Sequence, residues 1–371
     1  MSDFENVEEN SKARKVEETN ILKPTHTYYP GLDTLRAIAI ILVIFSHWLP
    51  YEHFVNSFLP NGPLGVTLFF VLSGFLITGI LLNEKTKLEL GQKSISAIFK
   101  AFYLKRSLRI FPIYYLTLVA MLLLQIPEVK TYFWWHFSYA SNILFYLKKS
   151  FVNEYVSPLW SLSVEEQFYV FWPFMILFSN KRWLLFWLAL SIIIGTTFRM
   201  FPENITDKPF SYMQFLMPSC VDCFAIGGLI AYIQRFHLNK LILARKISTS
   251  LAFAGMFYFF FAVHMFGENE FVRIVFNRTI FSMFAVAFIL FIITQDIEKS
   301  LLAKVVEYDF FVFIGKISYS LYLWHILIPH LEFIKQDGQR FFTRLIILFI
   351  LSTLSFFLLE KPLLSLKKYV K

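Results

Sequence analysis

The sequence predicts an all-α polytopic membrane protein with about ten transmembrane helices and both termini in the cytoplasm. Of its 371 residues, 57% are hydrophobic and only 16% are charged, and the mean hydropathy is +0.56. Soluble domains do not combine so much apolar surface with so little charge. Several stretches approach or exceed the roughly 18 apolar residues that a helix needs to cross the hydrocarbon core. We therefore expect much of the apolar surface, including many of the 46 Phe side chains, to face the lipid bilayer.

Ten apolar stretches are the predicted spans. Proline residues and charged clusters separate most of them, which is the punctuation expected between helices. No internal repeat at a fixed period is evident, so the sequence lends no support to an inverted-repeat transporter. The spans are centred near Val43, Leu72, Thr117, Val170, Ala189, Phe224, Met256, Ala287, Leu321 and Ile350.

The distribution of lysine and arginine predicts the orientation. With the N-terminus in the cytoplasm, the cytoplasmic loops and tails hold 22 of these residues and the opposite side holds eight. Cytoplasmic loops carry an excess of positive charge, so both termini are expected in the cytoplasm. The membrane is expected to be the cell (inner, cytoplasmic) membrane. The net charge of +9 is then a topology signal and does not indicate a nucleic-acid partner.

The polar ends of the chain flank one membrane domain. Residues 1–30 are polar and mixed in charge, and they lack the short apolar core and cleavage site of a signal peptide. We expect a disordered cytoplasmic tail there. Residues 31–362 form the predicted transmembrane domain, and residues 363–371 a short basic cytoplasmic tail.

The first span contains two ionisable residues, Arg36 and His47. Eleven residues of helix amount to three turns plus about 20°, so both side chains share one face and lie about 16 Å apart along the axis. Ionisable groups inside a membrane helix are costly and usually functional. The alternative is an arginine that snorkels to the interface and a histidine that bonds a neighbouring helix.

A second group of ionisable residues is expected in the outer half of the membrane. Glu165 and Glu166 enter about two turns into the fourth span, and His325 reaches a similar depth in the ninth. A carboxylate near a histidine suits general acid–base chemistry. The alternative is a capping box, because Ser163 and Glu166 have its spacing and Pro158 just before them fits a helix start.

Two arginines open the third span. Arg106 and Arg109 lie three residues apart and therefore on one helix face, where they can bind phosphate. Ordinary positive-inside anchoring is the alternative, and it is the expected role of Lys105. Together with Arg36, the two arginines would form a cationic entrance for a phosphorylated cytoplasmic ligand.

Three residues in the sixth span are weaker candidates. Asp222 is a lone carboxylate within the apolar run and needs a partner. Cys220 and Cys223 have zinc-like spacing, but no second Cys/His pair accompanies them. We therefore expect two small buried apolar side chains and no metal site.

Small residues in the second and sixth spans are expected to let helices approach closely. Gly65, Gly74, Gly227 and Gly228 have this interpretation. Ser73 belongs with them, since it could act as a nucleophile only if a base reached it.

The loop between the third and fourth spans is rich in aromatic residues. It suits an interfacial belt, a short re-entrant segment or a platform on which a sugar stacks. The cluster comprises Tyr132, Phe133, Trp134, Trp135, His136, Phe137 and Tyr139.

From about Tyr29 to Pro362 the chain resembles the acyltransferase-3 family of multi-pass membrane O-acyltransferases. Seven motifs in the right order carry the resemblance: GLDTLRAIAIILVIFSHW, GVTLFFVLSGFLIT, KRSLRIFPIYY, LWSLSVEEQFYVFWP, DCFAIGGLIA, ISYSLYLWH and the closing EKP. Similar proteins take an acyl group, most often acetyl, from cytoplasmic acyl-CoA and pass it to a hydroxyl of an acceptor. That acceptor is often a lipid-linked or cell-surface glycan, such as lipopolysaccharide O-antigen. Some members carry a fused esterase-like domain; we expect none after the last span here, and a possible separate extracytoplasmic partner is left open.

The resemblance also implies site residues. It implies an Arg-x10-His motif, a basic pair and a Ser–Glu stretch, which this sequence matches with Arg36 and His47, Arg106 and Arg109, and Ser161, Ser163, Glu165 and Glu166. We expect the three arginines to bind the phosphates of acetyl-CoA. His47 would be the general base or a transient acyl acceptor, with Glu165 or Glu166 orienting it or binding sugar. Ser161, Ser163, His325 and Asp222 are the expected contacts to the acceptor.

Two rival interpretations remain. A proton-coupled transporter or lipid-sugar flippase also needs buried histidine, glutamate and arginine. The missing repeat and the lack of paired helix breaks argue against it. A membrane scaffold would leave the buried charges unexplained.

Overall fold

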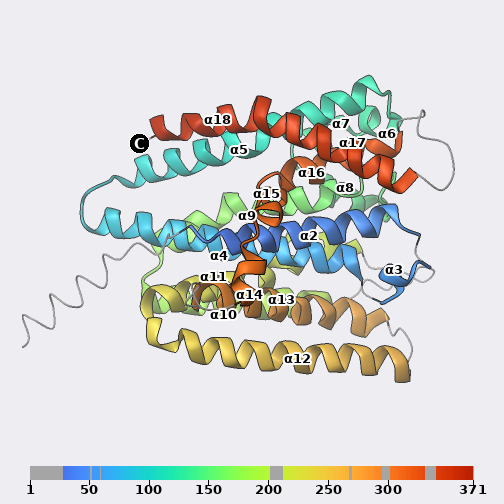
Figure 1. The fold of residues 1–371 in the computed structure, drawn as a ribbon. Helices are drawn as coiled ribbons and strands as arrows, with labels where there is room; N and C mark the ends of the chain where they lie inside the picture. The colour runs from blue at the N-terminus through green and yellow to red at the C-terminus, as the bar shows by residue number, and fades with distance from the viewer. Residues whose placement is uncertain are drawn as a thin grey trace, which may run out of the picture.

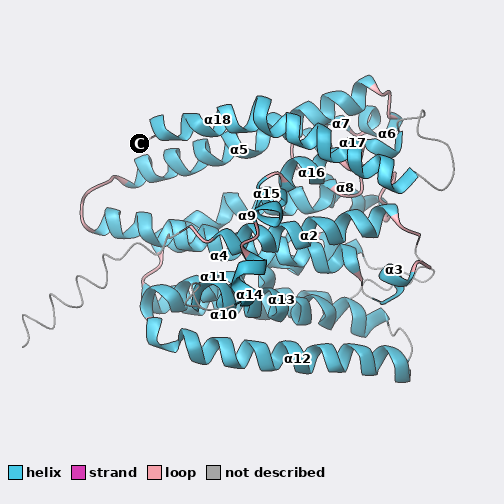
Figure 2. Cartoon of the chain, in the orientation of Figure 1, coloured by secondary structure: helices cyan, strands magenta, loops and turns pink. Residues whose placement is uncertain are grey.

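The computed structural model of the chain describes residues 28–370 apart from 51, 59, 201–211, 267–269, 295–300 and 331–339. The predicted tail therefore lies, except for residues 28–30, outside the described residues. All regular structure in the described part is helical (Figure 2). The longer helices are α2 (Pro30–Trp48), α4 (Asn61–Glu89), α5 (Ile95–Leu123), α9 (Leu159–Phe178), α10 (Lys181–Met200), α11 (Val221–Phe236), α12 (Leu241–Phe266), α13 (Glu270–Thr294) and α17 (Arg340–Ser355). The short ones are α3 (Phe54–Phe58), α6 (Pro127–Thr131), α7 (Phe133–Phe137), α8 (Ser141–Lys148), α14 (Leu301–Val306), α15 (Asp309–Lys316), α16 (Ser318–Trp324) and α18 (Lys361–Ser365).

Shorter helical turns complete the chain. Between α17 and α18 the chain forms one π-helical turn, η7 (Phe356–Glu360). The 3-10 turns are η1 (Tyr212–Phe215), η2 (Met217–Cys220), η3 (Leu238–Lys240), η5 (Ile328–His330) and η8 (Leu366–Tyr369).

Seven helical segments in the described residues are long and apolar enough to cross a membrane. They include α2, α4, α5, α10, α13, the run from η2 through α11 and the run from α17 to η8. These segments and the apolar composition of the chain make it a multi-pass membrane protein. The expected total of about ten spans stays a prediction. The predicted span near Leu321 is not one continuous helix, because the chain turns at Ile317 between α15 and α16.

Helix α4 lies at the centre of the bundle, where it packs against α2, α9, α11 and α13 (Figure 1). Glycines make this close packing possible. A Cβ atom at Gly74 would collide with the backbone of Phe224, and one at Gly227 with the carbonyl of Val71. The expectation that small residues bring these helices together is confirmed.

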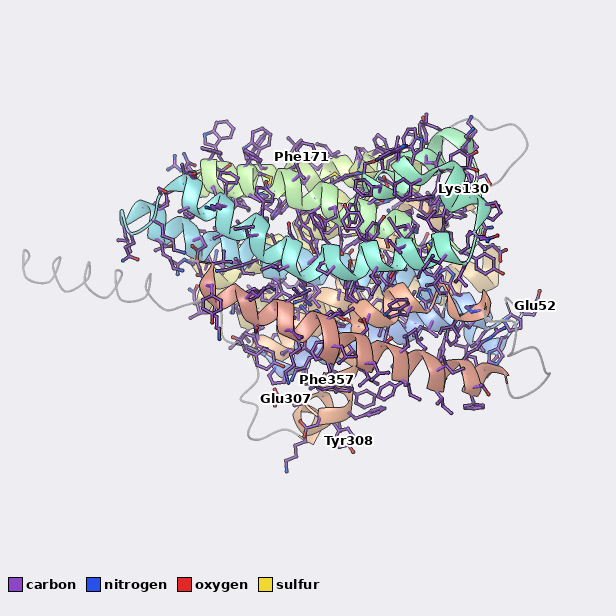
Figure 3. The ribbon with its side chains drawn as sticks, turned by 90° about the horizontal axis from the view of Figure 1, so that it is seen from above. Glu52, Lys130, Phe171, Glu307, Tyr308 and Phe357 are labelled. Atoms are coloured by element: carbon purple, nitrogen blue, oxygen red, sulfur yellow. The ribbon has the colours of Figure 1, made fainter. Side chains whose placement is uncertain are left out.

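The outer surface of the bundle is apolar. Large side chains remain exposed there, including Phe171 at 63% and Phe257 at 74%, and Figure 3 shows Phe171 at the outer edge. In water such a surface would drive aggregation, whereas in a bilayer it contacts lipid tails.

The two ends of the bundle differ. The turn between α4 and α5 lies at the same end as the C-terminus, while α3 and α6 lie at the other (Figure 1). Figure 3 shows Glu52 and Lys130 at that second end. We call the two ends the α4–α5 end and the α6 end.

The aromatic loop folds into α6, α7 and α8 and packs onto α5. The ring of Tyr139 stacks on Tyr114 with 4.1 Å between centroids, and the Tyr114 hydroxyl donates to the carbonyl of His136 at 2.7 Å. His136 is fully buried, its Nδ1 lies 2.8 Å from Ser141 Oγ, and burial lowers its pKa to about 4. Trp134 is exposed. The cluster thus has a buried structural half and an exposed half, and its role in sugar binding stays a prediction.

Candidate active site

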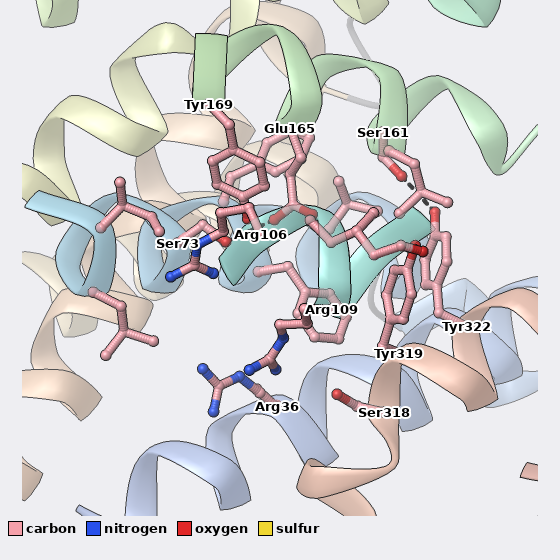
Figure 4. Close-up of a pocket in the computed structure, with 17 residues that line it drawn as sticks. Arg36, Ser73, Arg106, Arg109, Ser161, Glu165, Tyr169, Ser318, Tyr319 and Tyr322 are labelled. Carbon is pink, nitrogen blue, oxygen red and sulfur yellow. Dashed lines mark hydrogen bonds between the residues drawn. The ribbon is translucent and has the colours of Figure 1, made fainter. Parts of the chain in front are cut away.

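Polar side chains from α2, α4, α5, α9 and α16 gather around one pocket inside the bundle (Figure 4). Its volume is about 90 Å³. The pocket therefore accommodates a small group and not a whole nucleotide. Its polar lining comprises Arg36, Ser73, Arg106, Arg109, Ser161, Glu165, Tyr169, Ser318, Tyr319 and Tyr322.

The three predicted arginines meet in this pocket. Arg36 projects from α2 and forms an ion pair with Asp33 one turn earlier on the same helix. The guanidinium carbon of Arg106 lies 5.5 Å from the ring centroid of Tyr169, a cation–π contact. Arg109, in contrast, has no ion pair in the part of the chain that the structure describes. Two guanidinium groups are thus anchored, and that of Arg109 is available to an anion.

A larger cavity of about 470 Å³ adjoins the pocket. Both cavities are lined by Arg36, Leu76 and Arg109, so these three residues form the boundary between them. The Tyr28 hydroxyl lines this outer cavity and donates to Asp33 Oδ2 at 2.7 Å, and burial together with this carboxylate raises the pKa of Tyr28. We call this cavity the vestibule.

The two neighbouring glutamates are separated by the helix that carries them. Glu165 lines the pocket and accepts a hydrogen bond of 2.6 Å from Ser73 Oγ. Glu166 does not line it, because successive residues on a helix point about 100° apart. Glu166 Oε1 is buried and has no hydrogen-bond partner among the described residues.

The pocket is closed on its inner side by Tyr322. Its hydroxyl oxygen lies 2.6 Å from Ser161 Oγ, and the hydroxyl donates to the carbonyl of Pro158 at 3.0 Å. The ring of Tyr322 contacts those of Phe69 and His325, with centroids 6.3 Å and 5.5 Å away. Tyr322 therefore lies between the arginine pocket and the histidines.

His47 and His325 form a contact pair beyond Tyr322. Their ring centroids are 5.2 Å apart. His325 is buried, its Nδ1 lies 2.5 Å from the carbonyl oxygen of Tyr322, and its Nε2 has no partner among the described residues. His47 is exposed. The rings of the two histidines are thus in contact, whereas Glu165 faces the arginines, and no hydrogen bond joins either glutamate to either histidine in the described chain.

The remaining predicted residues lie outside the pocket. Ser163 Oγ donates to the carbonyl of Leu159 and accepts from the backbone of Ser141. The capping box was a wrong interpretation: α9 begins directly after Pro158, as expected, but without a side-chain cap, which places Ser163 and Glu166 inside the helix.

Asp222 has found the partner that it needs. It is fully buried and forms two hydrogen bonds with Arg199, of 2.9 Å and 2.7 Å. Arg199 lies in the last turn of α10. Cys220 and Cys223 are buried and free, as expected. Substrate binding by Asp222 and Ser163 stays a prediction, and neither lines the pocket.

Sequence reasoning missed several residues of the pocket and the vestibule. Tyr319 and Tyr322 belong to the motif ISYSLYLWH, and Glu360, which accepts a hydrogen bond from Ser320, belongs to the closing EKP. Tyr169 lies one turn beyond Glu165 on the same face of α9. Their place in the motifs was a signal, but contacts between distant helices were needed to interpret it.

Comparison with known proteins agrees with this arrangement. A family model described as an acyltransferase domain matches residues 29–361. The chain belongs to the acyltransferase-3 family. The match covers every residue that lines the pocket, and all those that line the vestibule except Tyr28 and Leu364.

Several curated proteins are similar to this chain. The peptidoglycan O-acetyltransferase OatA of Listeria monocytogenes is 28% identical over 91% of this chain and 56% of its own length. The "Putative O-acetyltransferase SACOL0978" of Staphylococcus aureus is 30% identical over 90% of this chain and 57% of its own length. The "Putative acetyltransferase ORF330" of Acidianus two-tailed virus is 29% identical over 86% of this chain and 88% of its own length. The chain thus spans little more than half the length of its listeria and staphylococcus relatives. No solved structure matches it.

Proposed function

We propose that this chain is a membrane O-acyltransferase that moves an acyl group, acetyl in the first instance, from acyl-CoA to a hydroxyl of a cell-envelope glycan. The observation that carries the proposal is the small pocket lined by Arg36, Arg106 and Arg109. Ser73 and Glu165 form a hydrogen bond inside this pocket. Family membership and relatives named as O-acetyltransferases support the same reaction class.

The proposed donor site follows from size and charge. CoA is a polyanion, and arginine binds phosphate through charge-assisted hydrogen bonds. The vestibule, at about 470 Å³, suits the nucleotide end of the donor, and the pocket, at about 90 Å³, suits only the acyl thioester. Arg109 would bind phosphate at the boundary, since it lines both cavities and has no ion pair among the described residues.

The proposed orientation places the donor in the cytoplasm of a bacterial-type inner membrane. The vestibule is lined by Tyr28 at the start of α2 and by Glu360 near the C-terminus, both in regions next to the lysine-rich loops and tails of the sequence. Positive charge collects on the cytoplasmic side. Both termini are then cytoplasmic, and the α6 end faces outward.

His47 is the proposed general base on the acceptor hydroxyl. It lies near the end of α2 and is exposed, while its partner His325 is buried against Tyr322. An exposed imidazole can take a proton from a hydroxyl that arrives from the outer side. The glycan, whether peptidoglycan, lipopolysaccharide O-antigen or another lipid-linked sugar, would approach His47 from the α6 end, with or without an extracytoplasmic partner.

The test is acetyl transfer by the purified, detergent-solubilised protein. Radiolabelled acetyl-CoA is offered with peptidoglycan fragments in one set of reactions and with lipid-linked O-antigen in another, and label on the glycan is counted. We expect transfer to one class of acceptor by the wild type and its loss in His47→Ala protein. Normal turnover by that variant, with its fold checked by size-exclusion chromatography, would contradict the assignment of His47 as the general base.

A matched variant controls for damage to the fold. His53 lies outside the bundle core, near the same end, and its Nδ1 accepts a local hydrogen bond from the backbone N–H of Val55. His53→Ala protein should transfer acetyl at the wild-type rate. Loss of transfer in both histidine variants would show that the region, and not His47 chemistry, is responsible.

A further inference from the structure

The hydrogen bond between Ser73 and Glu165 gives the pocket the parts of an acyl-accepting nucleophile. Ser73 Oγ donates to Glu165 Oε1 at 2.6 Å, and both side chains line the small pocket. A serine is a poor nucleophile by itself, and it becomes a good one when a general base lies within hydrogen-bond reach. The sequence alone indicated no general base for Ser73, and the structure brings Glu165 into that position.

The surroundings keep this pair in position. Gly74, the next residue on α4, packs against the backbone of Phe224 and fixes the height of this turn of the helix. Tyr169, one turn beyond Glu165 on α9, contacts the guanidinium of Arg106 across the same pocket. Guanidinium donors next to a nucleophile can stabilise the negative oxygen that forms when a carbonyl is attacked.

The position of the pair also matters for the path of the acyl group. Ser73 and Glu165 lie on the arginine side of Tyr322, and the histidines lie beyond it. A donor bound at the arginines therefore meets Ser73 before it meets His47. An acyl group attached to Ser73 stays in the pocket after CoA has left.

We propose that Ser73 is a catalytic nucleophile that carries the acyl group as an ester between donor and acceptor, with Glu165 as its general base. This inference rests on the proposed function and adds a covalent intermediate to it. Because the pocket is small, at about 90 Å³, the acyl groups that we expect it to accept are small ones such as acetyl.

The two half-reactions balance. In the first, the Ser73 hydroxyl proton moves to Glu165, Oγ bonds to the acyl carbon, and the carbon–sulfur bond breaks. CoA leaves as the thiolate and takes up a proton from water in the vestibule. In the second, the Tyr322 side chain turns aside to admit the acceptor, the acceptor hydroxyl loses its proton to His47, its oxygen bonds to the acyl carbon, and the ester bond to Ser73 breaks. Ser73 Oγ recovers its proton from Glu165, and His47 releases its own to water.

The experiment is acyl-enzyme trapping with the full chain. The purified protein is incubated with radiolabelled acetyl-CoA and no glycan, denatured and digested, and the labelled peptide is identified by mass spectrometry. Acetyl-CoA binding and glycan transfer are measured on the same preparation. We expect one acetyl group on Ser73, and its release when glycan is added before denaturation.

Variants sharpen the result. Ser73→Ala protein should take no label, and Ser73→Cys protein should take label as a thioester that neutral hydroxylamine cleaves, whereas the oxygen ester of the wild type resists it. Glu165→Gln should slow labelling by about 10²–10⁴-fold, the usual contribution of a general base. Thr67→Ala is the matched control, because Thr67 is a hydroxyl residue of the same helix that bonds the Pro63 carbonyl and lies outside the pocket. It should label like the wild type.

Two results would overturn the covalent step. One is wild-type protein that binds acetyl-CoA and acetylates glycan but takes no label on Ser73, in which case the proposed transferase stands without the intermediate. The other is undiminished labelling in Ser73→Ala protein. Protein that neither binds acetyl-CoA nor transfers acetyl would overturn the proposed function as well.

Discussion

Replacement of Arg109 by alanine should weaken acyl-CoA binding without unfolding the protein. Arg109 lines both the pocket and the vestibule and has no ion pair among the described residues. Its loss leaves no described carboxylate unpaired. Removal of Arg36, in contrast, would leave the buried Asp33 carboxylate without its counter-ion. Arg109 is therefore the better position for this perturbation.

The size of the effect follows from the bond that is lost. A hydrogen bond to a charged group contributes about 1.5–3 kcal/mol, and about 1.4 kcal/mol corresponds to a tenfold change in Kd. Arg109 is half-buried, so solvent screening favours the lower part of that range. We therefore expect the Kd for acetyl-CoA to rise by about 10-fold in Arg109→Ala protein, and by more in the double variant with Arg106→Ala.

The assay is isothermal titration of the detergent-solubilised protein with acetyl-CoA and with free CoA. Lys105→Ala is the matched control, since Lys105 neighbours Arg106 in sequence but lines neither the pocket nor the vestibule. Added salt should weaken wild-type binding more than binding by the arginine variant, because screening acts on the charge that the variant lacks. An unchanged Kd in the double variant would refute the assignment of the arginines to the donor.

Three further predictions concern the fold that holds the site. Asp222→Asn protein should unfold at a lower temperature, because it leaves Arg199 buried without its counter-ion at a cost of about 3–5 kcal/mol. The double variant Arg199→Met/Asp222→Leu should be more stable than Asp222→Asn, and equal stability of the two would contradict this explanation. Between pH 6.5 and about 4 the wild type should lose up to about 3 kcal/mol of unfolding free energy that His136→Asn protein does not lose. The folded state keeps His136 neutral down to a pKa of about 4, whereas the unfolded chain binds the proton at the ordinary pKa, so stability falls as the pH falls. Chemical unfolding at several pH values measures this, and identical pH profiles would exclude it. Gly74→Ala should cost about 1–3 kcal/mol by forcing α4 away from Phe224, whereas Gly62→Ala, whose Cβ would meet only the side chain of Ser46, should cost less in the same thermal scans.

The sequence predicted the features that depend on depth along a helix. Arg36, Arg106 and Arg109 could be placed at one level because residue spacing fixes the rise along each span, and the structure gathers them in one pocket. Spacing along the spans also places His47 and His325 at a similar depth, and the structure brings their rings into contact. The close approach of α4 and α11 followed from glycines that allow it.

Features that depend on which helix faces meet could not be predicted. The separation of Glu165 from Glu166 and the bond from Ser73 depend on the rotation of α9 against α4, which spacing does not fix. The partner of Asp222 is 23 positions away on another helix. Near Leu321, hydropathy predicted one span because it averages over a window, and an average does not reveal the turn at Ile317.

Sided acetyl transfer tests the central claim most directly. Membrane vesicles that carry the protein are prepared in both orientations, and labelled acetyl-CoA is added outside. The account predicts labelled glycan in the vesicles that expose the α4–α5 end, none in those that expose the α6 end, and loss of label in the Arg106→Ala/Arg109→Ala variant. Equal labelling from both faces, or labelling that is indifferent to the two arginines, would contradict it.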